Sequence, residues 1–132
     1  MKLLIDNNLP PLMGRGLGAL FEGTHTIIHI RDKFGTGSLD DVEWIELLGK
    51  EGGWSVLSGD RKIATRKPSR QAFLGAGLVG FFAAPAVMTL PLERKTARIL
   101  VLWPRLVAIS ESAGSGCFDL GIKGDKLHQI RA

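Results

Sequence analysis

Three aspartates stand where a folded chain can collect carboxylates into one site. Asp6 directly follows the apolar run 3–5, Asp60 follows the stretch 54–58, and Asp41 lies at the start of a helical pattern. Short apolar runs that end in a polar turn are typical of buried strands in a parallel sheet, and ligands bind beyond the carboxyl ends of such strands. The spacing therefore predicts that Asp6 and Asp60 meet at one edge of a sheet, with Asp41 close by.

Carboxylates gathered in this way repel one another. At an effective dielectric near 20, two unit charges about 4 Å apart cost about 4 kcal/mol. A hard divalent cation removes that cost, and Mg²⁺ and Mn²⁺ prefer oxygen ligands. A metal held by carboxylates can activate water and bind a phosphoryl oxygen, so the pattern indicates metal-dependent phosphodiester hydrolysis. We predict that Asp6, Asp41 and Asp60 are the catalytic and metal-binding residues.

Each acid also has a purely structural interpretation. An Asp after a strand is often a turn residue or a helix cap. Ser38 or Asp40 could cap the helix that follows, and complementing the helix dipole is the better interpretation of Asp40. Asp41 and Glu43 can simply complement the helix dipole, although Glu43 is also a candidate supporting ligand. Asn7 is the second candidate supporting residue, but Asn7 and Asn8 more often make local hydrogen bonds in a turn than contact a substrate.

Cations follow the third acid closely. Between residues 61 and 70 the basic side chains are Arg61, Lys62, Arg66, Lys67 and Arg70. A charge run is usually a solvated surface, but next to a metal ligand it can also hold the phosphates that flank a cleavage site. We expect Arg61 and Lys62 to be the main phosphate contacts, and Arg31 a weaker one. The net charge of +4 adds a small preference for a polyanionic partner.

The other reactive side chains fit structural roles better. His25 and His29 alternate on a predicted strand without a third ligand at metal spacing, and Cys117 lacks the partners of a nucleophile. We interpret Trp44, Trp54 and Trp103 as core residues. A single cysteine excludes an internal disulfide, no apolar run reaches the ~18 residues of a membrane span, and no export signal is evident. The chain is therefore expected to be cytoplasmic.

The remaining pattern predicts the elements that position these residues. Strands are expected at 2–5, 24–30, 54–58, 78–84 and 117–122, and helices at 9–21, 38–51, 68–74 and from 91 to a kink or end at Pro104. Alternating strands and helices are typical of a three-layer α/β domain with a mostly parallel sheet, here of five strands. Residues 1–122 are expected to form one domain, with a frayed basic tail over 123–132.

The motifs resemble those of the compact PIN-like domains. The likeness is carried by the opening Leu-Leu-Ile-Asp6-Asn-Asn-Leu-Pro, the helix start Asp41-Val-Glu-Trp-Ile, and the segment Val-Leu-Ser-Gly-Asp60-Arg-Lys-Ile. It extends to about residue 122. Taken in order, the three motifs are most similar to the VapC-type toxins of bacterial toxin–antitoxin pairs.

This resemblance implies a Rossmann-like sheet of order 3-2-1-4-5 and a Mg²⁺- or Mn²⁺-dependent endoribonuclease. It implies that Asp6, Asp41 and Asp60 match the family's acids, that RNA is the substrate, that a cognate antitoxin blocks the site, and that homodimers form. The sequence departs from the family in two respects. Asn7 stands where many compact relatives carry Glu, and no fourth acid can be placed, since Asp119 lies too far along the chain to be assigned.

Two other functions stay open at this point. The first is a PIN-like fold without catalysis that binds RNA or a protein partner. The second is phosphoryl transfer through a phospho-aspartate, which ranks last because Asp6-Asn7-Asn8 lacks the acid two residues on that haloacid-dehalogenase-like phosphatases need. A neighbouring reading frame for a small DNA-binding antitoxin would favour the toxin.

Overall fold

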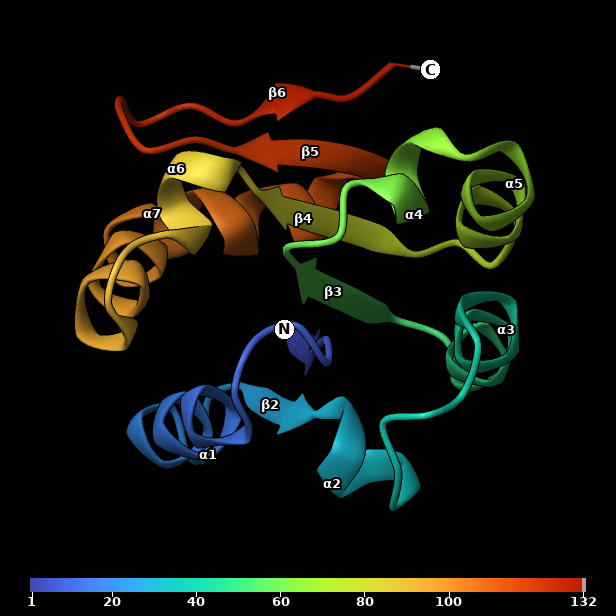
Figure 1. Ribbon diagram of the computed structural model, residues 1–132, viewed down its shortest axis with the longest axis horizontal. Helices are drawn as coiled ribbons and strands as arrows, with labels where there is room; N and C mark the ends of the chain where they lie inside the picture. The colour runs from blue at the N-terminus through green and yellow to red at the C-terminus, as the bar shows by residue number, and fades with distance from the viewer. Residues whose placement is uncertain (132) are drawn as a thin grey trace.

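The computed structural model describes residues 1–131, which form one six-stranded sheet with helices on both faces (Figure 1). The strands are β1 (Lys2–Ile5), β2 (Thr26–His29), β3 (Trp54–Ser58), β4 (Val79–Ala83), β5 (Gly116–Leu120) and β6 (His128–Gln129). β1 to β5 are parallel and β6 runs antiparallel to β5. The predicted three-layer α/β class with a mostly parallel sheet is confirmed.

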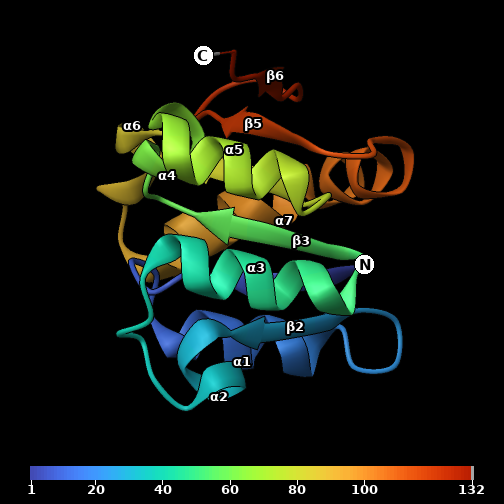
Figure 2. The same cartoon turned by 90° about the vertical axis from the view of Figure 1, so that its right-hand side faces the viewer.

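The helices divide between the two faces. α1 (Pro11–Leu20), the short α6 (Pro85–Met88) and the long α7 (Leu92–Ser112) pack on one face. α2 (Ile30–Phe34), α3 (Asp41–Glu51), α4 (Lys62–Thr65) and α5 (Lys67–Gly75) pack on the other. Figure 2 shows α3 and α5 side by side over the sheet. Successive strand residues point to opposite faces, so Leu3 and Ile5 belong to the first core and Leu4 to the second.

The strand order differs from the expected 3-2-1-4-5. It is β2-β1-β3-β4-β5-β6, with β3 paired directly to β1 from Lys2↔Trp54 to Ile5↔Leu57. Burial explains the correction. Every residue of β3 is buried, whereas β2 begins with an exposed Thr26, and a strand that is buried on both faces takes an interior position. As a result, the carboxyl ends of β1 and β3 are direct neighbours.

The expected end of the last helix at Pro104 is also wrong. α7 continues through Pro104 to Ser112. Pro104 has no N–H, so the backbone carbonyl one turn earlier loses its hydrogen-bond donor. Because Pro104 is exposed, water can bind that carbonyl instead. No helix among residues 1–131 is long and apolar enough to cross a membrane.

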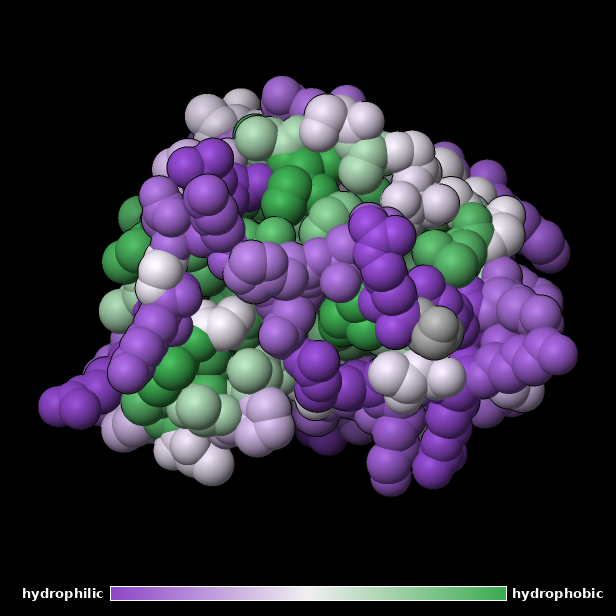
Figure 3. Space-filling model, turned by 90° about the horizontal axis from the view of Figure 1, so that it is seen from above, coloured by the Kyte–Doolittle hydropathy of each residue, from purple (hydrophilic) through white to green (hydrophobic). Residues whose placement is uncertain are grey.

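Residues 128–130 are not frayed as expected, and Ala132 lies outside the described residues. His128 and Gln129 form β6, and Ile130 is buried in the core beneath α3 to α5. β5 is therefore covered at its outer side and is not an edge strand. Figure 3 looks onto this side of the molecule, where hydrophilic side chains surround smaller hydrophobic patches.

Two glycines give opposite predictions for stability. A Cβ at Gly80 of β4 would lie 2.5 Å from the ring of Phe82 and 2.7 Å from that of Phe73, whereas a Cβ at Gly16 of α1 would meet nothing within 4 Å. We expect Gly80→Ala to lower the free energy of unfolding by about 1–3 kcal/mol through overpacking. Gly16→Ala should raise it by about 1 kcal/mol through helix propensity. Urea unfolding of both variants tests this; a neutral Gly80→Ala would contradict the packing described here.

Candidate functional site

The strand order brings two of the predicted acids together at one edge of the sheet. Asp6 follows β1 and continues its pairing with β3, since the Asp6 N–H donates to the Leu57 carbonyl at 2.9 Å. Asp60 follows β3, and Asp41 begins α3 beside them. All three line one pocket of about 270 Å³, together with Asn7, Asn8, Ile30, Gly37, Leu39 and Trp44.

Asp6 is the most enclosed of the three carboxylates. Its side chain is buried, with Oδ1 accepting a hydrogen bond from the Asn7 N–H and Oδ2 accepting one from the Ser58 hydroxyl, both at 2.7 Å. Burial raises the pKa of Asp6, and the negative charges of Asp41 and Asp60 raise it further, while the two hydrogen bonds act in the opposite direction. The two hydrogen bonds thus favour the charged form of Asp6, whereas the burial of its side chain and the neighbouring acids disfavour that form.

Ser58 is a site residue that the sequence analysis missed. Its fully buried hydroxyl donates to Asp6 and accepts the Asp60 N–H at 2.9 Å, so one side chain fixes the relative position of two acids. A signal for it exists in the sequence. Ser58 is the polar last residue of a buried strand, two residues before the acid that follows that strand.

Asp41 is oriented from within its own helix. Trp44, one turn later, donates its indole N–H to Asp41 Oδ1 at 3.1 Å, so this tryptophan positions an acid as well as packing in the core. Asp40 accepts the Glu43 N–H at 3.0 Å, so of the two candidate caps, Ser38 and Asp40, it is Asp40 that caps α3. Glu43 is exposed and does not line the pocket, so the structure does not bring this candidate ligand to the site.

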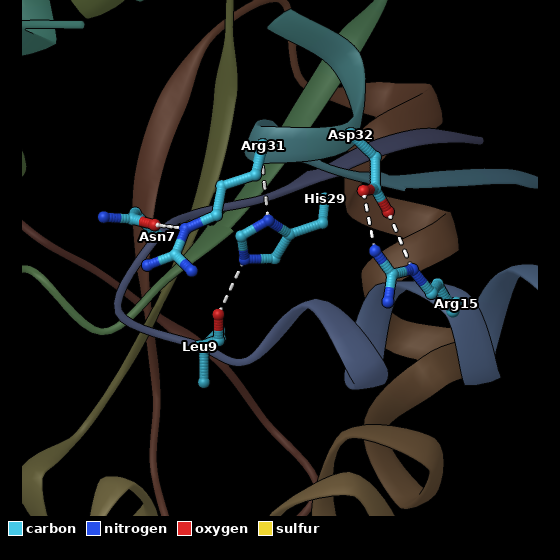
Figure 4. Close-up of polar contacts among 6 residues, drawn as sticks. All are labelled: Asn7, Leu9, Arg15, His29, Arg31 and Asp32. Atoms are coloured by element: carbon cyan, nitrogen blue, oxygen red, sulfur yellow. Dashed lines mark hydrogen bonds and ion pairs between the residues drawn. The ribbon is translucent and has the colours of Figure 1, made fainter. Parts of the chain in front are cut away.

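The predicted cations lie on both sides of the pocket. On the α2 side, Arg31 donates from Nε to Asn7 Oδ1 at 2.6 Å, which also places Asn7 in the pocket wall (Figure 4). On the α4 side, Arg61 forms an ion pair with Asp119, and the exposed Lys62 forms no ion pair with any described residue. Asp60 Oδ1 accepts the Lys62 N–H, so the acid and the first cations share one turn.

A buried histidine fixes the loop that carries Asn7. His29 lies between Leu9 and Arg31 in Figure 4: its Nε2 contacts the Leu9 carbonyl at 2.7 Å, and its Nδ1 accepts the Arg31 N–H at 3.1 Å. These contacts require a neutral ring with the proton on Nε2. The structural role expected for His29 is thus confirmed, and it joins the loop after β1 to the start of α2.

The charge and chemistry of the pocket fit a hydrated hard cation. The ion pairs among residues 1–131 use other acids, so no Lys or Arg neutralises the three aspartates. As placed, no three His, Cys, Asp or Glu side chains of the described chain are grouped closely enough to hold a metal ion. Mg²⁺ usually keeps several waters and binds through only one or two carboxylates, which this arrangement of oxygen donors allows.

A family comparison agrees with this geometry. The family model of the PIN like domain matches residues 1–85, which contain β1 to β4 and all three aspartates. The chain belongs to the PIN-like domain family. PIN domains are generally nucleases and usually use divalent metals. No curated protein and no solved structure matches the chain.

The raised pKa of Asp6 predicts a stability cost in the absence of metal. An acid whose pKa is higher in the folded than in the unfolded chain destabilises the fold as the pH rises above its unfolded value, near 4. We therefore expect Asp6→Asn, in EDTA at pH 7, to unfold at a higher temperature than the wild type. The difference should shrink as the pH falls towards 4.

Asp40→Asn is the matched control for this prediction. It removes one negative charge directly before Asp41 but keeps an equally good N-cap, so its melting temperature should not rise in the same way. An Asp6→Asn protein that is no more stable than the wild type at pH 7 would contradict the electrostatic description of the pocket.

Proposed function

We propose that this PIN-like domain is a Mg²⁺- or Mn²⁺-dependent endoribonuclease that acts in the cytoplasm as the toxin of a toxin–antitoxin pair. The observation that carries the proposal is the pocket itself, in which Asp6, Asp41 and Asp60 converge without a neutralising cation from the described chain. Uncompensated carboxylates around a polar pocket are the arrangement that a hard cation stabilises.

The three aspartates would hold the cation, two of them directly and the third through water. When bound, the ion polarises the scissile phosphate and lowers the pKa of an attacking water. Ser58 and Trp44 keep the carboxylates in place, because each donates a hydrogen bond to one of them. Asn7 lines the same pocket and serves as a supporting residue.

The cations beside the pocket support a nucleic-acid substrate. Arg31 approaches from the start of α2, and Lys62 and Arg61 from the start of α4, so a strand that crosses the pocket meets positive charge on both sides. Contacts of this kind bind phosphates without reading sequence, and they supply much of the affinity of a nuclease for RNA.

The toxin role is supported by the likeness of the three acid-bearing motifs to VapC-type toxins. A cognate antitoxin would act by covering the acid pocket, which is open at the sheet edge. Homodimer formation is proposed on the same resemblance. The genomic neighbourhood gives an inexpensive check, since a small DNA-binding protein encoded next to this chain would favour the toxin role.

A second candidate function is an inactive PIN-like module that binds RNA or a protein. Two observations favour it: Asn7 occupies a position where many compact relatives carry Glu, and the described residues contain no preformed group of three metal ligands. A module of this kind would bind its partner equally well with or without EDTA, and Asp60→Asn would not weaken the binding.

The test of the proposed function is cleavage of a panel of structured RNAs with Mn²⁺, with Mg²⁺ and with EDTA. We expect metal-dependent cleavage by the wild type and a loss of at least about 100-fold in Asp6→Asn, because even partners of metal ligands cost 10–100-fold when removed. The control Asp40→Asn should cleave like the wild type. Expression of the same three proteins should slow growth for the wild type and Asp40→Asn only.

The outcomes separate the two functions. Cleavage that survives EDTA, or that is undiminished in Asp6→Asn, would contradict the metal-dependent nuclease. Absence of cleavage together with RNA binding that EDTA leaves unchanged would support the inactive module.

A further inference from the structure

An ion pair joins the acid pocket to the C-terminal part of the chain. Arg61, the residue directly after Asp60, donates from Nη1 to Asp119 Oδ1 of β5, 58 residues further along. The two side chains are 36% and 35% exposed. An ion pair at such an accessible place contributes at most about 1 kcal/mol to folding, so its main effect is to fix where the guanidinium lies.

The sheet places Asp119 at the same edge as the three aspartates. Asp119 is in register with Phe82 of β4, and Phe82 is in register with Ser58 of β3. Adjacent strands are about 4.8 Å apart, so the long side chain of Arg61 spans the width of one strand to reach this acid. β5 lies outside the family match, which ends at residue 85. This contact is therefore supplied by the part of the chain beyond the matched region.

The neighbours of Asp119 show which face of the sheet it lies on. Cys117 and Ile130 both pack in the core under α3 to α5. Because side chains alternate along a strand, Asp119 and its register partner His128 lie on that same face. His128 itself is exposed. Asp119 therefore lies on the face of the sheet that carries α4, the helix that follows Arg61.

The Arg61 guanidinium has N–H donors left to bind a ligand. It carries five N–H donors in a planar fork, and Nη1 is the only one of its nitrogen atoms that is hydrogen-bonded within residues 1–131. A fork that is held on one side by a carboxylate can still donate to a phosphate on the other.

We infer that Asp119 is a positioning residue, which holds the Arg61 guanidinium against a phosphate of the RNA strand next to the acid pocket. The inference rests on the proposed function, since it takes RNA as the substrate. It makes β5 a support of the substrate-binding surface, and it gives Asp119 a role without making it a fourth metal ligand.

Affinity for RNA tests this inference. The probe is a short fluorescein-labelled single-stranded RNA, titrated in EDTA to prevent cleavage and followed by fluorescence anisotropy. We expect Asp119→Asn to bind about fivefold more weakly, the upper limit for one accessible ion pair. With Mn²⁺ present, KM should rise while kcat stays nearly constant. A matching melting temperature confirms that the variant is folded.

Asp125→Asn is the matched control. Asp125 lies in the same hairpin, is 76% exposed and pairs with Arg105 away from the pocket. Either substitution removes one negative charge, so general electrostatics predicts slightly tighter RNA binding by both. Only a positioning role predicts that Asp119→Asn weakens binding while Asp125→Asn does not.

A double variant tests whether Asp119 acts through Arg61. Arg61→Gln alone should weaken binding and reduce the slope of log K against log salt by about 0.7, as expected for the loss of one phosphate contact with a single strand. In the Arg61→Gln background, Asp119→Asn should add no further loss. An equal loss in both backgrounds, or an Asp119→Asn protein that binds as tightly as the wild type, would overturn the inference.

Different results would contradict the nuclease proposal and the positioning role of Asp119. A wild type that cleaves RNA but is insensitive to Asp119→Asn leaves the nuclease intact and overturns the positioning role. A wild type that binds RNA through Arg61 and Asp119 but never cleaves it supports the positioning role and contradicts the nuclease. A wild type that does not bind RNA overturns the positioning role, and cleavage then decides the nuclease independently.

Discussion

The site depends on one constraint: the Asp6 carboxylate is buried between two adjacent strands next to two other acids. Burial and the charges of Asp41 and Asp60 disfavour its ionised form, and the hydrogen bonds from Ser58 and Asn7 offset part of that cost. The hydrogen bond from Ser58 exists only because β3 pairs directly with β1, which sets the hydroxyl of Ser58 beside Asp6. The strand order is therefore a functional feature as well as a topological one.

Cations from helices on one face of the sheet flank the buried Asp6 carboxylate and the two acids beside it. The negative pocket lies between a cation on α2, tied to the loop after β1 through Asn7 and His29, and cations on α4, one of which is tied to β5 through Asp119. Arg31 and Arg61 are thus held by different parts of the fold. A polyanion that enters from either side meets a fixed positive group before it reaches the carboxylates, and a divalent ion can neutralise the pocket itself.

Local pattern was sufficient to predict much of this arrangement. Apolar runs ending in Asp6 and Asp60 and the amphipathic α3 after Asp40 are visible in the sequence, and the strand 54–58 has the expected bounds. The strand order was not predictable in the same way, because it depends on competition for interior positions between distant strands. The Arg61–Asp119 contact and the two-residue β6 likewise leave no periodic signal, since they arise only when β5 takes its place beside β4.

The central claim is that the pocket is a divalent-metal site, and the most direct measurement is thermal unfolding with and without Mn²⁺. A ligand that binds only the folded state stabilises it by about 2.7 kcal/mol at 100 times its Kd. We predict that Mn²⁺ raises the melting temperature of the wild type and of Asp40→Asn but leaves Asp6→Asn unchanged. A wild type that does not respond to Mn²⁺, or an equal response in Asp6→Asn, would contradict the account.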